Sequence, residues 1–145
     1  MEDVRLLLQQ MYRRFGMLNK SCCTVGSHEV SLIQSQILYE IDRQHEPSMQ
    51  QIASTLGVDI TAFSHQIQTL IRRKLVVKQA SNSDKRVYIL SLTTEGKFVA
   101  TVIDEQINNQ LSQLFSGMSD EDKGKILDGL RLLNDRMEEL PACCG

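Results

Sequence analysis

Apolar residues recur at intervals of three and four through the first part of the chain. This spacing predicts one long amphipathic helix, because residues so spaced share a helix face. The apolar positions are Val4, Leu7, Leu8, Met11, Phe15 and Leu18. The pattern fades near residues 20–21, and we expect the small and β-branched residues around Gly26 to form a connection. A second helix is expected over about residues 31–43, with Pro47 as its outer limit.

The next stretch predicts two helices joined by a tight turn. Ser48 is expected to cap the first helix, with Gln51 completing a capping box, and Gly57 to end it. Asp59 is expected to cap the second helix. Its apolar side holds Ile60, Phe63, Ile67, Leu70 and Ile71, and its other side holds Thr61, Ser64, His65, Gln68 and Arg72. This arrangement is typical of a helix-turn-helix, whose second helix enters the major groove of DNA.

After Lys74 the hydrophobic period changes from that of a helix to that of a strand. Residues 75–77 and 87–92 are runs of β-branched, aromatic and apolar residues, which favour strands. The segment between them, residues 78–86, is polar and basic. Two short strands joined by a basic tip predict a wing beside the helix-turn-helix.

The last third of the chain is again helical in pattern. Thr94 is expected to cap a helix that extends to Phe115, and Gly117 and Ser119 to break and restart the chain. A final helix is expected before Pro141. The winged unit is too small to cover the apolar faces of these helices and of the first one. Part of this surface is therefore expected to be buried against a second copy of the chain.

Composition narrows the class of protein. The chain has 145 residues, of which 41% are hydrophobic and 23% charged, values typical of a globular domain with its own core. No apolar run approaches the ~18 residues that a membrane helix needs. The chain begins with Met1-Glu2-Asp3 rather than with a basic and then apolar signal, so we expect a cytoplasmic protein.

The formal net charge of −2 conceals an uneven distribution. Residues 60–90 hold six basic side chains and one acidic one, a net charge of +5, whereas residues 1–59 carry −2 and residues 91–145 carry −5. By itself the basic block is equally compatible with a solvated helix end. Because it coincides with the second helix of the helix-turn-helix and with the wing, we interpret it as a face that binds nucleic-acid phosphates.

Several motifs resemble the MarR family of winged helix-turn-helix regulators, from the second expected helix to the start of the fifth. They comprise Leu32 to Leu38, the run Ile52-Ala53-Ser54-Thr55-Leu56-Gly57-Val58, Leu70 with Leu75-Val76, and Asp84-Lys85-Arg86 followed by Leu90-Ser91-Leu92-Thr93-Thr94-Glu95-Gly96. The last of these, the junction between wing and helix, is the most discriminating. The resemblance implies a mainly α fold with a small β-wing, and a homodimer in which the first, fifth and sixth helices of the two subunits interleave.

The resemblance also implies roles for individual residues on a pseudo-palindromic site. Base edges in the major groove would be near Thr61, Ala62, Ser64 and His65, on the face that also carries Gln68. Arg86 would reach toward the minor groove, and Arg72, Lys78 and Lys85 would lie near phosphates. Asp84 is expected to position a nearby basic group, since phosphate repels a carboxylate. The family usually has glycine where this chain has Lys74, so we expect a tighter or more strained turn there.

The four cysteines form two adjacent pairs, Cys22-Cys23 and Cys143-Cys144. In a reducing compartment a structural disulfide framework is not expected. Three interpretations stay open: a thiolate site for a soft metal, a metalloid or an iron–sulfur cluster; a redox switch through disulfides between the pairs; and cysteines with no sensing role. His28 is a further candidate ligand, although a lone loop histidine is more often only solvated.

We therefore predict a single domain over residues 1–145, with a DNA-binding part at about 30–92 and dimerisation helices at about 1–21 and 94–141. It is expected to be a homodimeric DNA-binding repressor controlled through its cysteine pairs by a metal, a cluster or oxidation. Within the same fold, the alternative is a regulator released by a small phenolic or lipophilic effector. A different class is a winged-helix protein-interaction module. An enzyme is not expected, because no catalytic triad, phosphate-binding glycine loop or acid pair is present.

Overall fold

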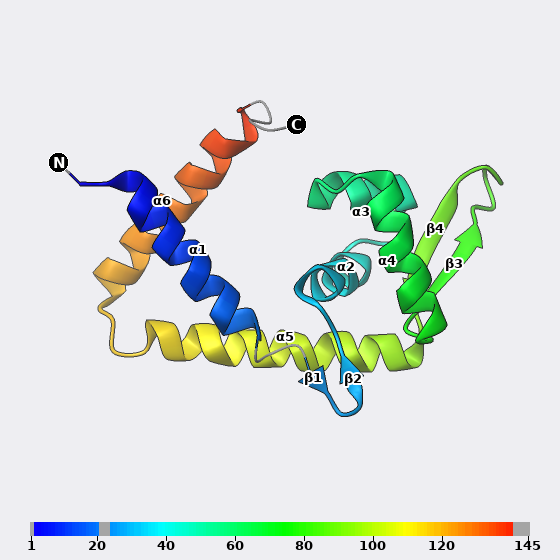
Figure 1. Cartoon of the computed structure of the whole chain (residues 1–145), viewed down its shortest axis with the longest axis horizontal. Coiled ribbons are helices and arrows are strands. Elements are labelled where there is room, and N and C mark those ends of the chain that lie inside the picture. The colour runs from blue at the N-terminus through cyan, green and yellow to red at the C-terminus, as the bar shows by residue number, and fades with distance from the viewer. Residues whose placement is uncertain (1, 21–23, 141–145) are drawn as a thin grey trace. The chain divides into compact units, whose positions relative to one another are not determined.

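The computed structural model describes residues 2–20 and 24–140, within which lie six helices and two antiparallel strand pairs (Figure 1). The elements are α1 (Val4–Lys20), β1 (Thr24–Val25), β2 (His28–Glu29), α2 (Leu32–Arg43), α3 (Met49–Leu56), α4 (Ile60–Arg72), β3 (Val76–Ala80), β4 (Tyr88–Leu92), α5 (Thr94–Phe115) and α6 (Asp120–Glu138). The chain divides into two compact units, residues 1–109 and 110–145. This architecture is the predicted one, mainly α with a small β-wing.

The core of the first unit joins the helix-turn-helix to the wing and to the first half of α5. Its completely buried side chains, each at most 1% exposed, are Ile37, Leu38, Ile52, Phe63, Ile67, Leu70, Leu75, Leu90 and Val99. They come from α2, α3, α4, the wing and α5, so a single cluster fixes all these elements together. Burial of each such side chain contributes about 1.5–3 kcal/mol to folding.

The wing is a two-stranded antiparallel ladder with a short third edge. Its register runs from Val76 opposite Leu92 to Ala80 opposite Tyr88. On the other side of β4, the Leu90 N–H donates to the Pro47 carbonyl at 2.9 Å, and an isolated bridge pairs the neighbouring residues 48 and 89. The start of the helix-turn-helix is thereby attached directly to the wing.

The local signals at the helix-turn-helix are confirmed. Ser48 and Gln51 form a reciprocal capping box at the start of α3. Gly57 ends that helix in the left-handed conformation, at φ 64°. Asp59 caps α4 by accepting from the N–H groups of Thr61 and Ala62. These contacts depend only on residues close in sequence, which is why the sequence pattern locates them.

Three expectations need correction. Residues 24–29 are not a plain connection, because β1 and β2 pair as a hairpin around Gly26. The first wing strand extends to Ala80, beyond the expected residue 77. The residue that caps α5 is Thr93 and not Thr94, since the Thr93 hydroxyl accepts from the Gly96 N–H at 2.9 Å.

The turn after α4 is strained, as predicted from a lysine at a position where the MarR family usually has glycine. Lys74 has φ 61°, a left-handed conformation that glycine adopts at lower cost. Its N–H donates to the Ile71 carbonyl, and the Leu75 N–H donates to the Leu70 carbonyl. Together these two bonds make a Schellman motif, in which a left-handed residue satisfies the last carbonyls of a helix. The lysine therefore occupies a position suited to glycine.

The second unit contains the end of α5 and all of α6. α6, which the structure describes in full, has no buried residue, and two of its large apolar side chains are well exposed, Leu132 at 65% and Met137 at 58%. Ser119 caps α6, and Gly117 has φ 81°, so the predicted break and restart between the two helices is confirmed. None of the described helices is both long and apolar enough to cross a membrane.

Candidate nucleic-acid interface

Contacts at its first turn, along its inner side and at its middle fix the position of α4 and so of its outward face. Asp59 fixes its first turn, and Phe63, Ile67 and Leu70 anchor its inner side in the core. At its middle, the Gln34 side-chain amide on α2 donates to Gln66 Oε1 at 3.0 Å. Helical periodicity then turns the remaining side chains toward solvent.

The side chains predicted to face bases and phosphates lie on this outward face. Five of them are exposed, and Ser64 is half-buried. The exposed ones are Thr61, Ala62, His65, Gln68 and Arg72. Arg72 Nη2 donates to Thr69 Oγ1 at 3.2 Å, so its guanidinium lies along the helix rather than against a carboxylate. Its positive charge is not neutralised there.

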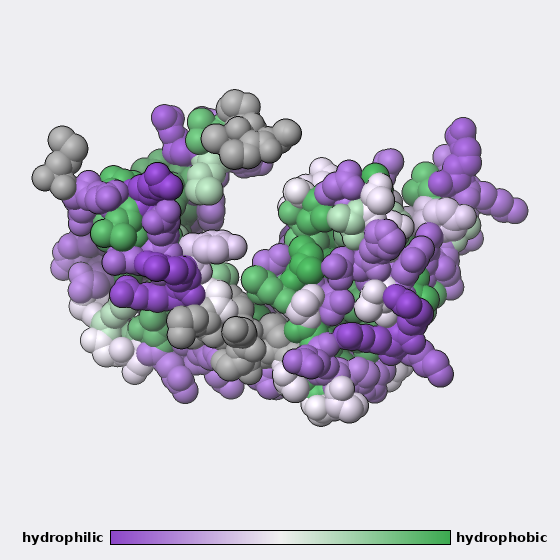
Figure 2. All heavy atoms as spheres, in the orientation of Figure 1, coloured by the Kyte–Doolittle hydropathy of each residue, from purple (hydrophilic) through white to green (hydrophobic). Residues whose placement is uncertain are grey.

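The wing presents its cations in two different ways. Lys78 on β3 places its ammonium 4.5 Å from the centre of the Tyr88 ring on β4. A cation over an aromatic face is attracted to it and keeps its charge. Lys85 at the tip is exposed, and hydrophilic side chains dominate the wing end in Figure 2.

Arg86 is held at the wing tip by Asp84. The carboxylate accepts from the Arg86 backbone N–H at 3.0 Å and from its Nε at 3.2 Å. These hydrogen bonds from Arg86 hold the pKa of Asp84 below its usual range. The arginine side chain nevertheless stays 91% exposed. Asp84 is therefore paired with a nearby basic group, as expected, and Arg86 stays exposed.

One cation of the basic block is exposed but makes a hydrogen bond to the protein backbone. Arg73 Nη1 donates to the Glu29 carbonyl on β2 at 2.6 Å, a contact between residues 44 positions apart. Arg73 belongs to the basic block of residues 60–90, but the sequence predicts a phosphate contact only for its neighbour Arg72. No local sequence signal distinguishes it from Arg72, because its partner is a backbone carbonyl distant in sequence.

The predicted thiol site lies outside the described residues, since both cysteine pairs fall at positions 21–23 and 141–145. His28, the additional candidate ligand, instead donates through Nε2 to Glu95 Oε1 at 2.9 Å. Across residues 2–20 and 24–140, no three His, Cys, Asp or Glu side chains are grouped to hold a metal ion.

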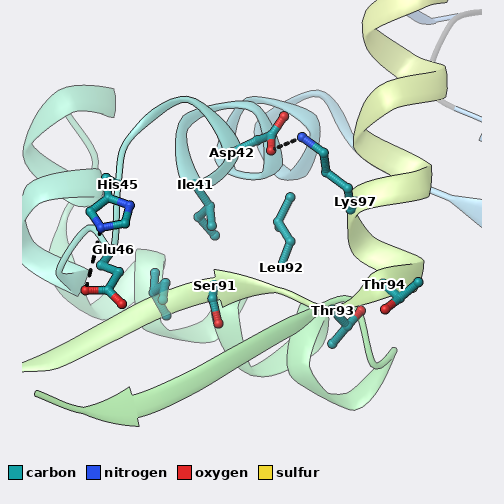
Figure 3. A pocket seen from close by; sticks show the side chains of 10 residues that line it. Ile41, Asp42, His45, Glu46, Ser91, Leu92, Thr93, Thr94 and Lys97 are labelled. Atoms are coloured by element: carbon teal, nitrogen blue, oxygen red, sulfur yellow. Dashed lines mark hydrogen bonds and ion pairs between the residues drawn. The ribbon is translucent and has the colours of Figure 1, made fainter.

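An open pocket of about 490 Å³ lies where α2, β4 and the first turn of α5 meet (Figure 3). Its floor is apolar and includes Ile41 and Leu92, while Asp42 and Lys97 form an ion pair at its rim. On another side His45 Nε2 lies 4.0 Å from Glu46. Such a surface can receive an apolar ring, with the Lys97 ammonium near its edge.

Comparisons with known proteins agree with this geometry. The sequence model of the MarR family matches residues 28–87, the segment from β2 to the wing tip. The uncharacterized HTH-type transcriptional regulator YwaE of Bacillus subtilis is 26% identical over 106 residues, which are 73% of this chain and 61% of YwaE. The matched segment thus spans less than two thirds of that relative.

Two further similarities cover nearly the whole chain. The transcriptional repressor MprA of Escherichia coli K12 is 26% identical over 137 residues, 94% of this chain and 77% of MprA. The crystal structure of Streptococcus pneumoniae FabT in complex with DNA superposes with a TM-score of 0.86 at 18% identity. That match covers 95% of this chain and 97% of FabT, and at this identity it shows the shared fold.

Proposed function

We propose that this protein is a transcriptional repressor of the MarR family that binds duplex DNA as a homodimer, since residues 28–87 match the sequence model of that family. The observation that carries the proposal is the set of exposed polar and basic side chains on α4 and the wing. These elements are held by one core, so they form a rigid surface of fixed shape. A rigid surface recognises DNA without first paying the entropy of ordering its contacts.

On DNA, α4 would enter the major groove with Thr61, Ala62, Ser64, His65 and Gln68 near base edges. Arg86, which is hydrogen-bonded to Asp84, would reach into the adjoining minor groove, whose negative potential attracts a guanidinium. Arg72, Lys78 and Lys85 would neutralise phosphates. Each such contact releases condensed counterions, so binding should weaken steeply with salt.

The homodimer is supported by apolar side chains that the described chain leaves exposed. On α1, Val4 is 64%, Met11 48% and Phe15 51% exposed, and on α6, Leu132 is 65% exposed. Patches of this kind on separate helices mark protein interfaces. A twofold interface made by these helices would place two winged units on one pseudo-palindromic site.

For control of DNA binding we propose the two cysteine pairs as the responsive groups, either as thiolate ligands of a soft metal, metalloid or iron–sulfur cluster, or as partners in disulfides. Cys22 and Cys23 lie between α1 and β1 in sequence, and Cys143 and Cys144 follow α6. A change at either pair acts next to a helix proposed to form the dimer. It would relieve repression by favouring a dimer whose winged units no longer match the half-site spacing.

The pocket of Figure 3 supports a second route of control, by a small phenolic or lipophilic effector. Its apolar floor suits an aromatic ring, and Lys97 would attract a phenolate or carboxylate once released from Asp42. The pocket adjoins Thr93, the residue that caps α5, so an occupant would contact the junction between wing and helix.

The function is tested by measuring affinity for DNA as a function of salt. The probes are a random 24-base-pair duplex and the tightest duplex that the protein selects from a randomised library. We expect a steep salt dependence for both and tighter binding to the selected duplex. Salt-insensitive binding without sequence selection would contradict the proposal and favour a protein-interaction module.

The route of control is tested with anaerobically purified protein. Metal analysis and an absorption spectrum are compared between the wild type and a variant with Cys143 and Cys144 changed to Ser. A bound metal or a cluster spectrum that the variant loses supports a thiolate site, and loss of DNA binding on oxidation supports the disulfide. If neither occurs while an aromatic carboxylate releases the DNA, the effector pocket is the route.

A further inference from the structure

The hairpin formed by β1 and β2 is too small to be stable alone. It pairs Thr24 with Glu29 and Val25 with His28 around the left-handed Gly26. An isolated two-stranded hairpin is at best marginally stable in water, and this one has only two residues in each strand. Its shape therefore depends on what the rest of the first unit provides.

Three anchors hold the hairpin in place. Val25 and Val30, 6% and 3% exposed, insert at its two ends into the hydrophobic core. His28 donates to Glu95 in the first turn of α5, beside which the hairpin lies in Figure 1. Arg73 donates to the Glu29 carbonyl from the end of α4. The hairpin thus bridges the recognition helix and the start of α5.

Arg73 occupies a special place on α4. It is the C-cap residue, immediately before the left-handed Lys74 at which the chain reverses into the wing. The N-terminal end of α4 is held by Asp59 and its middle by the contact between Gln34 and Gln66. The bond from Arg73 is the corresponding hold at the C-terminal end, made by a charged donor at 2.6 Å. Hydrogen bonds with one charged partner are stronger than neutral ones.

We infer that Arg73 is a positioning residue for DNA recognition, which orients α4 by tying its C-terminal end to the β1–β2 hairpin, and that it is not a phosphate ligand. The inference rests on the proposed function. A helix pivoting in the major groove moves its side chains relative to base edges, so loss of this tie lowers affinity for a selected sequence. Because no phosphate contact is lost, the number of released counterions stays the same.

The test compares DNA affinity and its salt dependence among matched variants, on the duplex that the wild type selects and on a random duplex. Arg73→Gln removes the tie to Glu29, and His28→Ala loosens the same hairpin without changing a group on the DNA-facing surface. Lys85→Ala serves as the phosphate-contact reference. Arg131→Gln, which removes an exposed arginine from α6, controls for the loss of one positive charge.

We expect Arg73→Gln and His28→Ala each to weaken binding to the selected duplex about tenfold, comparable with the loss of one hydrogen bond to a charged group. Binding to the random duplex should change little, and the slope of log affinity against log salt should stay at the wild-type value. The double variant should lose less than the product of the two single losses, because both act on one hairpin. Arg131→Gln should behave as the wild type.

A general loss of stability is separated by Ile37→Val, a core variant on α2 that lowers stability and leaves the hydrogen bonds of His28 and Arg73 intact. If it weakens binding as much as Arg73→Gln does, the positioning role is refuted. The role is also refuted if Arg73→Gln lowers the salt slope by about 0.9, as expected for Lys85→Ala, or if either hairpin variant binds normally. Failure of the wild type to select any duplex would contradict the proposed function itself.

Discussion

Gly96 allows the start of α5 to approach the turn that follows the recognition helix. A Cβ built on Gly96 would lie 1.9 Å from the Leu75 carbonyl oxygen and 2.9 Å from its carbon. Both are backbone atoms, so no side-chain rotation can relieve the contact. The substitution Gly96→Ala must therefore separate α5 from Leu75 by more than an ångström, since nonbonded carbon and oxygen atoms need about 3.3 Å.

Two hydrogen bonds of Thr93 depend on this close approach. The Thr93 N–H donates to the Leu75 carbonyl at 3.1 Å, and its hydroxyl donates to the Lys74 carbonyl at 2.6 Å. At about 1 kcal/mol each, their disruption costs roughly 2 kcal/mol. The higher helix propensity of alanine returns about 1 kcal/mol. We expect a net destabilisation of about 1 kcal/mol or more, a large fraction of a typical domain's stability.

The assay is urea denaturation followed by circular dichroism, at one fixed protein concentration. Gly129→Ala in α6 is the matched control, because a Cβ at Gly129 meets no atom within 4 Å. The control should gain up to about 1 kcal/mol, since it changes only helix propensity. If Gly96→Ala were as stable as Gly129→Ala, the close approach would not exist and the account of Thr93 would be wrong.

Three further variants probe the turn and the wing. Lys74→Gly should stabilise the protein by about 1 kcal/mol in urea denaturation, because glycine adopts the left-handed φ of 61° without a Cβ clash; a loss of stability would contradict the strain. Asp84→Asn should weaken DNA binding several-fold, measured by fluorescence anisotropy, since Arg86 loses its ionised partner. In the wild type the pair of Asp84 and Arg86 persists at neutral pH, and it is lost only as the pH falls through the lowered pKa of Asp84. An affinity insensitive to Asp84→Asn would refute a role of Asp84 in positioning Arg86. Lys85→Ala should reduce the salt slope by about 0.9, and an unchanged slope would exclude a phosphate contact there.

Features set by short-range contacts could be predicted from the sequence. The capping box of Ser48 and Gln51 and the left-handed Gly57 involve residues within a few positions of one another. The expected strain at Lys74 follows from one residue type at a helix end. In each case the deciding feature lies within a few residues of the chain, so the residue pattern contains the necessary information.

Features set by contacts distant in sequence could not be predicted. Two adjacent threonines can both cap α5, and the choice of Thr93 follows from its additional bond to the Lys74 carbonyl on another element. The strands of the β1–β2 hairpin are too short to show an alternation of apolar and polar residues. The hairpin is held by two contacts distant in sequence, from His28 to Glu95 across 67 positions and from Arg73 to the Glu29 carbonyl across 44. The partner of Arg73 is a carbonyl, which every residue possesses, so no pattern of side chains could identify it.

A count of charges over residues 60–90 does not say which group each cation contacts. Cations elsewhere in the first unit meet carboxylates, as Arg43 meets Glu40 and Lys97 meets Asp42. Arg73 meets a carbonyl, and its position is thereby fixed. Arg72 and Lys78 also meet neutral groups, a hydroxyl and an aromatic ring, which orient a cation without cancelling its charge. Within residues 60–90, Arg86 pairs with the carboxylate of Asp84, whereas Arg72 and Lys78 have neutral partners. The charge that each cation can offer a phosphate therefore depends on the partner that the fold gives it, which a count of charges does not contain.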